Sequence, residues 1–389
     1  MNLIDHSVLT PPLEAYQLNT IRPTRVEIDL SKIGSNVKQI RRQIPAGTKV
    51  MGIVKANAYG HGLTDISRYL ESSGIDSLGV GFLEEGIILR NVGIKIPILV
   101  LGGVLGYQIK LFITNDLDVT VSSLELAESI NAMMEANGRS ARIHLKIDTG
   151  MGRIGISPEN APLLAEKIVK LPHLDLVGLY SHFATSDGND NEYMYKQLER
   201  FDTAVRKIQS KGITVEHIHI ANSGAIINAP ESYYTTVRPG IALYGITPAE
   251  QMNTKMQLQT AFQLKSRIVF IKEIPSGVDI SYGRTFTSKK RTRIGTIPIG
   301  YGDGYSRLLS NKSEVLIKGR RFPVVGSVTM DQIMVDLDEA TDIHVGDDVT
   351  LLGTDGTETI TPWELARLMG TIPYELFCGI SARVPRYYF

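Results

Sequence analysis

Between residues 30 and 245 the sequence alternates short apolar runs with longer amphipathic stretches. The runs that resemble β-strands cover residues 49–54, 77–82, 96–101, 118–121, 143–147, 176–180, 217–220 and 235–237. Strands that alternate with helices in this way are typical of repeated βα units around a parallel sheet. Eight runs in series favour an α/β fold of the (β/α)8 TIM-like barrel type, with an open doubly wound sheet as the alternative.

After about residue 255 the pattern changes to strands separated by tight turns. The predicted strands cover residues 266–271, 293–298, 315–317, 322–325, 333–337 and 348–352. One helix is predicted at 362–369, because Thr361 is a suitable N-cap and Pro362 fits the first helical position. The sequence therefore predicts an N-terminal arm over residues 1–21, a barrel over 22–258 and a mostly-β C-terminal domain over 259–389.

Charge and cysteine content exclude several classes of protein. The 41 Lys and Arg residues balance the 41 Asp and Glu residues, so there is no overall attraction to nucleic acid. The single cysteine, Cys378, makes neither an internal disulfide nor a cysteine metal site, and no metal is expected. Residues 1–6 lack the features of a signal peptide, and the longest apolar run, 96–107, is too short and too broken to span a bilayer. We expect a cytoplasmic protein without a membrane partner.

Polar residues directly after the apolar runs are the candidates for function, because a barrel enzyme has its active site at the carboxyl ends of its strands. Lys55 follows the first run. A lysine at such a desolvated rim becomes a nucleophile toward carbonyl groups. The segments 223–224 and 238–240, which contain glycine, follow the seventh and eighth runs, where barrels commonly bind phosphate. Together these features indicate a phosphorylated carbonyl compound held as a Schiff base, either pyridoxal phosphate as a cofactor or a sugar phosphate as an aldolase substrate.

Residues 54–62, Val-Lys-Ala-Asn-Ala-Tyr-Gly-His-Gly, closely resemble the pyridoxal-phosphate attachment motif of the alanine racemase family, the fold-type III amino-acid racemases. The resemblance runs from about residue 24 to the end of the chain. Independent motifs follow in the order and spacing of that family, at 146–153, 181–184, 238–241, 282–284, 300–305, 330–332 and 383–386. A sugar-phosphate aldolase predicts none of the later motifs.

The resemblance implies a two-base mechanism for Lys55 and Tyr282. Lys55 matches the lysine that carries the cofactor and acts as one base, and Tyr282 matches a base supplied by the other subunit of a head-to-tail homodimer. Racemisation removes the Cα proton from one face and returns a proton on the other, so bases on opposite sides suffice. The implied reaction converts L-alanine to D-alanine for peptidoglycan.

The resemblance also implies a set of binding residues. Arg238 matches the residue that faces the pyridine nitrogen, with His182 as its partner, and an arginine leaves that nitrogen unprotonated because it does not give up its own proton. Arg153 matches the residue near the phenolic oxygen and the substrate carboxylate. Lys146 matches a lysine that is carbamylated in some members, where it steadies Arg153. The implied phosphate contacts are Tyr59, Ser223, Gly240 and Ile241, and the implied substrate contact from the partner subunit is Met330.

Two positions in the expected substrate corridor differ from typical alanine racemases. Ala382 occupies the place of a tyrosine, and Ser327 the place of a common arginine, while Asp187 and Tyr301 are predicted to line the same corridor. The smaller side chains open volume beside the substrate, so a broad-specificity, serine or basic amino-acid racemase is the alternative. A pyridoxal-phosphate decarboxylase and a non-catalytic pyridoxal-phosphate-binding protein are further alternatives, disfavoured by Tyr282 and by the presence of the β domain.

Overall fold

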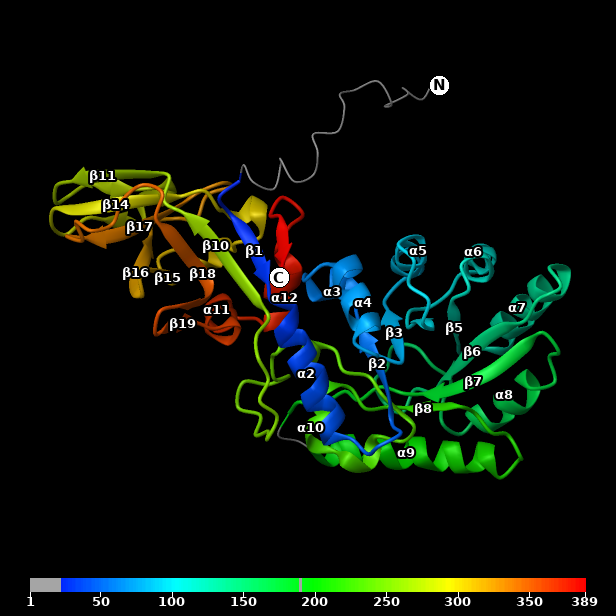
Figure 1. Ribbon diagram of the computed structural model, residues 1–389. Helices are drawn as coiled ribbons and strands as arrows, with labels where there is room; N and C mark the ends of the chain where they lie inside the picture. The colour runs from blue at the N-terminus through cyan, green and yellow to red at the C-terminus, as the bar shows by residue number, and fades with distance from the viewer. Residues whose placement is uncertain (1–21, 189–190) are drawn as a thin grey trace, which may run out of the picture. The chain divides into compact units, whose positions relative to one another are not determined.

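The computed structural model describes residues 22–188 and 191–389 (Figure 1). It divides into two compact units: a barrel unit, Asp29–Ala261, and a β unit formed by residues 22–28 together with Phe262–Phe389. The arm expected over residues 1–21 lies outside the described residues. Within the described part of the chain, no helix is both long and apolar enough to cross a membrane.

The barrel unit is built on one parallel sheet that has eight strands among the described residues. The strands are β2 (Lys49–Ile53), β3 (Ser77–Val80), β4 (Ile98–Val100), β5 (Asp118–Val121), β6 (Ala141–Lys146), β7 (Leu174–Tyr180), β8 (His217–His219) and β9 (Thr236–Val237). β2 to β8 pair in chain order, and β9 pairs with β2. Backbone hydrogen bonds from Thr235 N to Ile218 O, at 3.2 Å, and from Arg238 N to Ala221 O, at 2.9 Å, bridge β8 and β9. The predicted TIM-like barrel is confirmed.

Helices follow the strands and cover them because each has one apolar face. In α9, for example, Met194, Phe201, Val205 and Ile208 recur at helical spacing and are buried. The helices of this unit are α2 (Leu30–Gln43), α3 (Lys55–Tyr59), α4 (Leu63–Ser72), α5 (Leu83–Asn91), α6 (Ile109–Thr114), α7 (Leu124–Ala136), α8 (Ala161–Ile168), α9 (Asn191–Gln209) and α10 (Ser223–Asn228), with short 3-10 turns η2 (Gly106–Gln108), η3 (Pro230–Ser232) and η4 (Ile241–Tyr244).

The barrel strands are buried on both faces, and every residue of β3 and β5 is buried. This is the usual situation of a parallel sheet that has helices outside and packed side chains inside. Each buried aliphatic side chain, such as Leu78 or Val119, contributes about 1.5–3 kcal/mol. The interior also contains buried polar side chains, including His144 and His219, and these lead to the site described below.

The β unit contains a sheet that has ten strands among the described residues. Its order is β11-β14-β17-β16-β15-β18-β10-β1-β20, with β19 on β18, and β12 and β13 form a separate hairpin. The strands are β1 (Arg25–Ile28), β10 (Phe262–Arg267), β11 (Phe270–Ile274), β12 (Asp279–Ile280), β13 (Phe286–Thr287), β14 (Thr292–Ile297), β15 (Glu314–Ile317), β16 (Arg320–Val325), β17 (Ile333–Asp338), β18 (Asp348–Asp355), β19 (Glu358–Ile360) and β20 (Arg386–Tyr388). The helices and turns are α11 (Pro362–Met369), α12 (Pro373–Gly379), η5 (Tyr282–Arg284), η6 (Tyr301–Asp303) and η7 (Arg307–Leu309).

The structure differs from the sequence prediction at three places in this unit. The single strand predicted at 266–271 is wrong, because the chain changes partners there: Ile268 N bonds to Asp347 O and Val269 N to Thr296 O, which separates β10 from β11. The short helix α12 was not predicted. Residues 25–28 pair with β10 in antiparallel register, so the boundary between the units falls at Asp29.

Candidate active site

Lys55 is the second residue after the end of β2 and the first residue of α3, and it is half-buried. The turn that follows it, α3, is left-handed: Ala56, Asn57, Ala58 and Tyr59 have φ values of 53°, 56°, 51° and 53°. A left-handed backbone costs a residue with a Cβ atom roughly 1–2 kcal/mol, so four in succession require compensating contacts. The barrel therefore holds this lysine on a strained and tightly defined turn.

Side-chain hydrogen bonds compensate for part of this strain. The carboxylate of Glu85 accepts from Ala56 N at 2.6 Å and from Gly81 N at 2.8 Å. The side-chain oxygen of Asn57 accepts from Leu63 N at 2.8 Å. Glu85 thus ties the turn to the end of β3, and Asn57 ties it to the start of α4.

A small cradle of hydroxyl and backbone N–H groups lies at the ends of β8 and β9. Ser223 Oγ accepts from Gly240 N at 2.8 Å, and Ile241 begins the 3-10 turn η4. A Cβ atom placed on Gly240 would lie 2.5 Å from Tyr59 Oη, so only glycine allows this close approach. Hydroxyl groups and helix-terminal N–H groups gathered in this way suit a phosphate.

Arg238 follows β9 and is 4% exposed. Its guanidinium donates to Ser181 O at 2.7 Å and Ile220 O at 3.2 Å, to His182 Nδ1 at 3.1 Å and to His219 Nδ1 at 2.9 Å. Because a guanidinium only donates, both imidazoles accept at Nδ1, and we assign their proton to Nε2. Burial, followed by the positive charge of Arg238, lowers the pKa of both histidines well below the ordinary value.

The hydrogen bonds continue from His219 through the barrel interior. His219 Nε2 lies 3.0 Å from His144 Nδ1, and His144 Nε2 lies 3.4 Å from Asp118 Oδ2 at the start of β5. A carboxylate only accepts, so every donor in the chain points from the guanidinium toward the carboxylate. Burial by itself raises the pKa of Asp118, but its hydrogen bonds with His144 and Arg142 and the charge of Arg142 outweigh it, and the net pKa is lowered.

Lys146 is almost fully buried beside an aromatic ring. Its Nζ atom lies 4.1 Å from the centre of the Tyr180 ring, which also stacks on His219 with centroids 4.9 Å apart and planes 5° apart. Burial, followed by the charges of Arg238 and Arg153, lowers the pKa of Lys146 well below its ordinary value. A shift in this direction favours the neutral amine, which is the nucleophilic form.

Several positive charges converge around His182. Beyond burial, its pKa is lowered further by the charges of Arg238, Lys146, Arg153 and Lys55. The neighbouring carboxylate of Asp148 accepts hydrogen bonds at 2.9–3.1 Å from three backbone N–H groups of the turn that follows it. The carboxyl end of the barrel therefore presents an excess of positive charge that suits an anionic ligand.

A second group of predicted residues lies in the β unit. Tyr282 begins η5 and is 74% exposed, whereas Ser327 is buried and donates its hydroxyl to Tyr282 O at 2.8 Å. Tyr301 and Met330 are exposed, and Gly302 donates its N–H to Met330 O at 2.9 Å. Ala382 is also exposed, and the hydroxyl of the preceding residue, Ser381, donates to Gly302 O.

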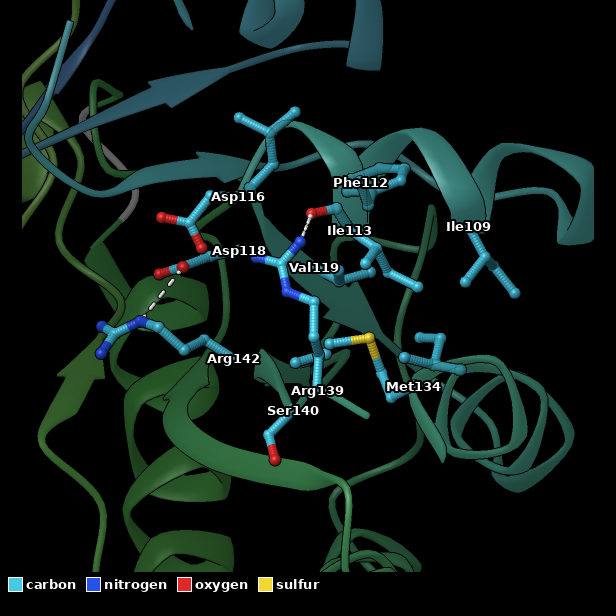
Figure 2. A pocket seen from close by; sticks show the side chains of 13 residues that line it. Ile109, Phe112, Ile113, Asp116, Asp118, Val119, Met134, Arg139, Ser140 and Arg142 are labelled. Atoms are coloured by element: carbon cyan, nitrogen blue, oxygen red, sulfur yellow. Dashed lines mark hydrogen bonds and ion pairs between the residues drawn. The ribbon is translucent and has the colours of Figure 1, made fainter. Parts of the chain in front are cut away.

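A cavity of about 90 Å³ lies at the other end of the barrel strands, where β5 and β6 begin, and Figure 2 shows the side chains that line it. Its lining is mostly apolar, with Phe112 and Met134 among the residues drawn. Arg142 bonds to Asp118 at its edge, at 3.2 Å. None of the predicted site residues lines this cavity, so it is distinct from the site around Lys55.

The structure thus separates the predicted residues into two groups. The barrel unit holds Lys55, Tyr59, Lys146, Arg153, His182, Ser223, Arg238, Gly240 and Ile241 at the carboxyl end of its strands, with Asp187 exposed after β7. The β unit holds Tyr282, Tyr301, Ser327, Met330 and Ala382. Sequence reasoning missed Glu85, Asp118, His144, Tyr180 and His219, which lie in segments that were interpreted as ordinary strands and helix starts. The alternation of histidine and isoleucine at 217–219 is the sequence pattern that indicates a polar side chain inside the barrel.

Comparison with known proteins gives consistent matches. The sequence matches the family description "Alanine racemase, N-terminal domain" over residues 28–248 and "Alanine racemase, C-terminal domain" over residues 261–388. It is 44% identical over 369 residues to alanine racemase 2 of Caldanaerobacter subterraneus subsp. tengcongensis, covering 95% of each chain. The structure resembles alanine racemase of Clostridium difficile 630, with a TM-score of 0.90, 40% identity and coverage of 95% and 96%. It also resembles histidine racemase of Leuconostoc mesenteroides, with a TM-score of 0.88, 27% identity and coverage of 95% and 98%.

Proposed function

Because the chain belongs to the alanine racemase family, we propose that it is a pyridoxal-phosphate-dependent enzyme that interconverts L- and D-alanine. In this proposal the enzyme works in the cytoplasm as a head-to-tail homodimer, and its product D-alanine supplies peptidoglycan. The names of its relatives support alanine as the substrate.

The observation that carries the proposal is the concentration of positive charge beside a rim lysine. The pKa of His182 is lowered by the positive charges of Arg238, Lys146, Arg153 and Lys55. The same unit holds the cradle of Tyr59, Ser223, Gly240 and Ile241. These groups fit a ligand that carries a phosphate, a phenolic oxygen and an aldehyde. We propose that Lys55 binds the aldehyde carbon of pyridoxal phosphate and that the cradle holds its phosphate.

The arginine contacts suit the pyridine nitrogen of this cofactor. When bound, pyridoxal phosphate withdraws electrons from the substrate Cα–H bond and so makes that proton more acidic. Arg238 would donate a hydrogen bond to the ring nitrogen without giving up its own proton, which would leave that nitrogen unprotonated and the electron withdrawal weak. Its bonds to Ser181 O and His219 hold the guanidinium in place. A weak sink limits side reactions such as transamination.

Proton exchange at Cα needs a base on each face of the substrate. We assign one face to Lys55 and the other to Tyr282 of the partner subunit. The phenol of Tyr282 is 74% exposed on its own unit, which leaves it available to a second copy of the chain. Arg153 then holds the substrate carboxylate, with a contact from Met330 of the partner subunit.

A second candidate function is racemisation of amino acids with larger side chains. Ala382 and Ser327 replace larger residues of the expected corridor, to which we also assign Asp187 and Tyr301, and the similar fold of a histidine racemase supports this candidate. A hydrophobic pocket separates substrates that differ by one methylene by only about 1–3 kcal/mol. Specificity constants for L-alanine, L-serine, L-lysine and L-histidine distinguish the two candidates.

The proposal is tested on purified protein loaded with pyridoxal phosphate. Borohydride reduction followed by peptide mapping is expected to label Lys55, and L-alanine in deuterium oxide is expected to gain deuterium at Cα while it loses optical rotation. Lys55→Ala and Tyr282→Phe are each expected to reduce racemisation by at least about 100-fold, the lower end of the range for a general base. Release of CO₂, or a label on another lysine, would overturn the proposal.

A further inference from the structure

The turn that carries Tyr282 has an unusual backbone. Ser281 has φ 67° and ψ −178°, a combination that is essentially restricted to glycine. Gly283 and Arg284 also have positive φ values, of 74° and 51°. Because the ring of Tyr282 is 74% exposed, this backbone, and not packing of the ring, sets the direction in which the phenol points.

Two serine hydroxyls hold this backbone through reciprocal bonds. Ser281 Oγ donates to Ser327 O at 2.7 Å, and Ser327 Oγ donates to Tyr282 O at 2.8 Å. Ser327 is 5% exposed, so these bonds are largely shielded from water. A Cβ atom on Gly326 would lie 2.8 Å from Ile280 O, which shows how closely the two segments approach.

Further contacts hold the same turn at its edges. Asn311 accepts from Gly326 N at 2.6 Å and donates to Thr285 Oγ1 at 3.0 Å. The carboxylate of Asp279 accepts from Arg284 and from the hydroxyl of Thr287 in β13. The serine pair differs from these contacts because it bonds to the backbone of Tyr282 itself.

We propose that Ser281 and Ser327 are positioning residues for Tyr282. Their reciprocal bonds, here termed the serine clamp, keep the backbone of Tyr282 in the strained form that presents its phenol to the reacting carbon of the partner's site. The inference rests on the proposed function, in which Tyr282 exchanges a proton with Cα. It also gives Ser327 a role other than opening the corridor, since an arginine at this position lacks the short hydroxyl that bonds to Tyr282 O.

The test compares holoenzymes of Ser327→Ala, Ser281→Ala and Ser281→Gly with a control, Ser288→Ala. Ser288 is an equally buried serine of the same unit whose hydroxyl donates to Pro275 O at 2.7 Å and accepts from Val278 N at 2.9 Å, so neither of these bonds reaches η5. Loss of the clamp is expected to reduce kcat about 10- to 100-fold, the cost of a displaced catalytic group. Because the two enantiomers have equal free energy, kcat/KM stays equal in the two directions of the reaction in every variant. The effect on the proton transfer by Tyr282 is therefore measured through the primary deuterium isotope effects.

The isotope effect is expected to rise for the enantiomer whose proton Tyr282 removes and to fall for the other. Hydrogen exchange of peptides covering residues 280–286 is expected to become faster in the clamp variants. Ser281→Gly is the sharpest case: glycine tolerates this backbone, so Tm is not expected to fall, although the isotope effects shift as in Ser327→Ala. Ser288→Ala is expected to leave exchange and isotope effects unchanged.

The outcomes separate the clamp from the proposed function. If Ser327→Ala and Ser281→Gly match Ser288→Ala in both exchange and isotope effects while the wild-type enzyme racemises alanine, the clamp is refuted and the proposed function stands. If Tyr282→Phe keeps wild-type rates and isotope effects, Tyr282 is not the second base, and the clamp proposal fails with that assignment.

Discussion

Arg238 donates a hydrogen bond of 2.9 Å to His219 Nδ1 and thereby starts a chain of donors that crosses the barrel interior. The chain ends at Asp118, beside the cavity of Figure 2. Its two ends determine its proton order, because a guanidinium only donates and a carboxylate only accepts. The two imidazoles between them, on His219 and His144, are therefore expected to be neutral Nε2–H forms.

Acid is expected to destabilise the fold through its buried histidines. Burial lowers the pKa of His182 and His219 well below the ordinary value, and it lowers the pKa of His217 to about 4. The unfolded chain then binds more protons below pH 6.5, so stability falls by up to about 1.4 kcal/mol per histidine for each pH unit. Urea unfolding between pH 5 and 8 measures this slope. His219→Gln, which accepts and donates like the neutral ring without titrating, is expected to flatten it, and an unchanged slope contradicts the assignment.

Removing the charge of Asp118, at the end of this hydrogen-bonded chain, is expected to disturb the positions of the protons on its two imidazoles. In Asp118→Asn the side-chain amide is able to donate, which leaves His144 without a fixed acceptor at Nε2. We expect a loss of about 1–3 kcal/mol in the free energy of unfolding and mixed tautomers of His144 and His219 in nitrogen-15 spectra. Arg142→Gln is the control, because it removes a part-exposed partner of the same carboxylate and should cost under about 1 kcal/mol. Single, unchanged tautomers in Asp118→Asn argue against the chain.

The phosphate cradle is expected to tolerate no side chain at position 240. A Cβ atom in Gly240→Ala lies 2.5 Å from Tyr59 Oη, so we expect pyridoxal phosphate to bind about 10- to 100-fold more weakly, a loss of about 1.4–2.8 kcal/mol. Absorbance titration with the cofactor measures this. Tyr59→Phe removes the clashing oxygen, so affinity should be partly restored when it is added to Gly240→Ala. Equal affinities of the wild type and Gly240→Ala contradict the cradle.

Lys146 is expected to take up CO₂ as a carbamate. Its burial and the charges of Arg238 and Arg153 favour the neutral amine, and a carbamate would offset those same charges. Carbon-13 spectra of protein in labelled bicarbonate should show one carbamate signal that is absent in Lys146→Ala and is lost on denaturation. The same spectrum in both proteins counts against the modification.

Arg321 is expected to stabilise the β unit more than its neighbour Arg320. Arg321 forms ion pairs with Glu314, Glu358 and Glu364 at 2.7–3.0 Å, whereas Arg320 pairs with Asp342 alone among the described residues. A network of ion pairs stabilises a fold more than a single exposed pair does. Arg321→Ala should therefore lower the free energy of unfolding by about 1–2 kcal/mol, and Arg320→Ala by at most about 0.5 kcal/mol. Thermal unfolding of both variants checks the difference, and equal losses would show that the network adds nothing.

Local patterns predicted much of the fold. The eight barrel strands and the helix at 362–369, with Thr361 as its N-cap, lie where the sequence places them, because hydrophobic period and capping chemistry act within a few residues. The predicted strand at 266–271 failed for the opposite reason. Its apolar residues 268–271 continue without a break, and the change of pairing from β18 to β14 depends on partners about 20 to 90 residues away.

Local sequence patterns were sufficient to predict the barrel, the β unit and the motif around Lys55, because each depends on local periodicity or on a contiguous segment. Two other features became visible in the folded protein: one hydrogen-bonded chain links Arg238, His219, His144 and Asp118, and Ser281 and Ser327 bond across Tyr282. These contacts join residues of different strands and turns, and a hydrogen bond depends on distance and direction in space. No spacing along one strand or turn specifies them.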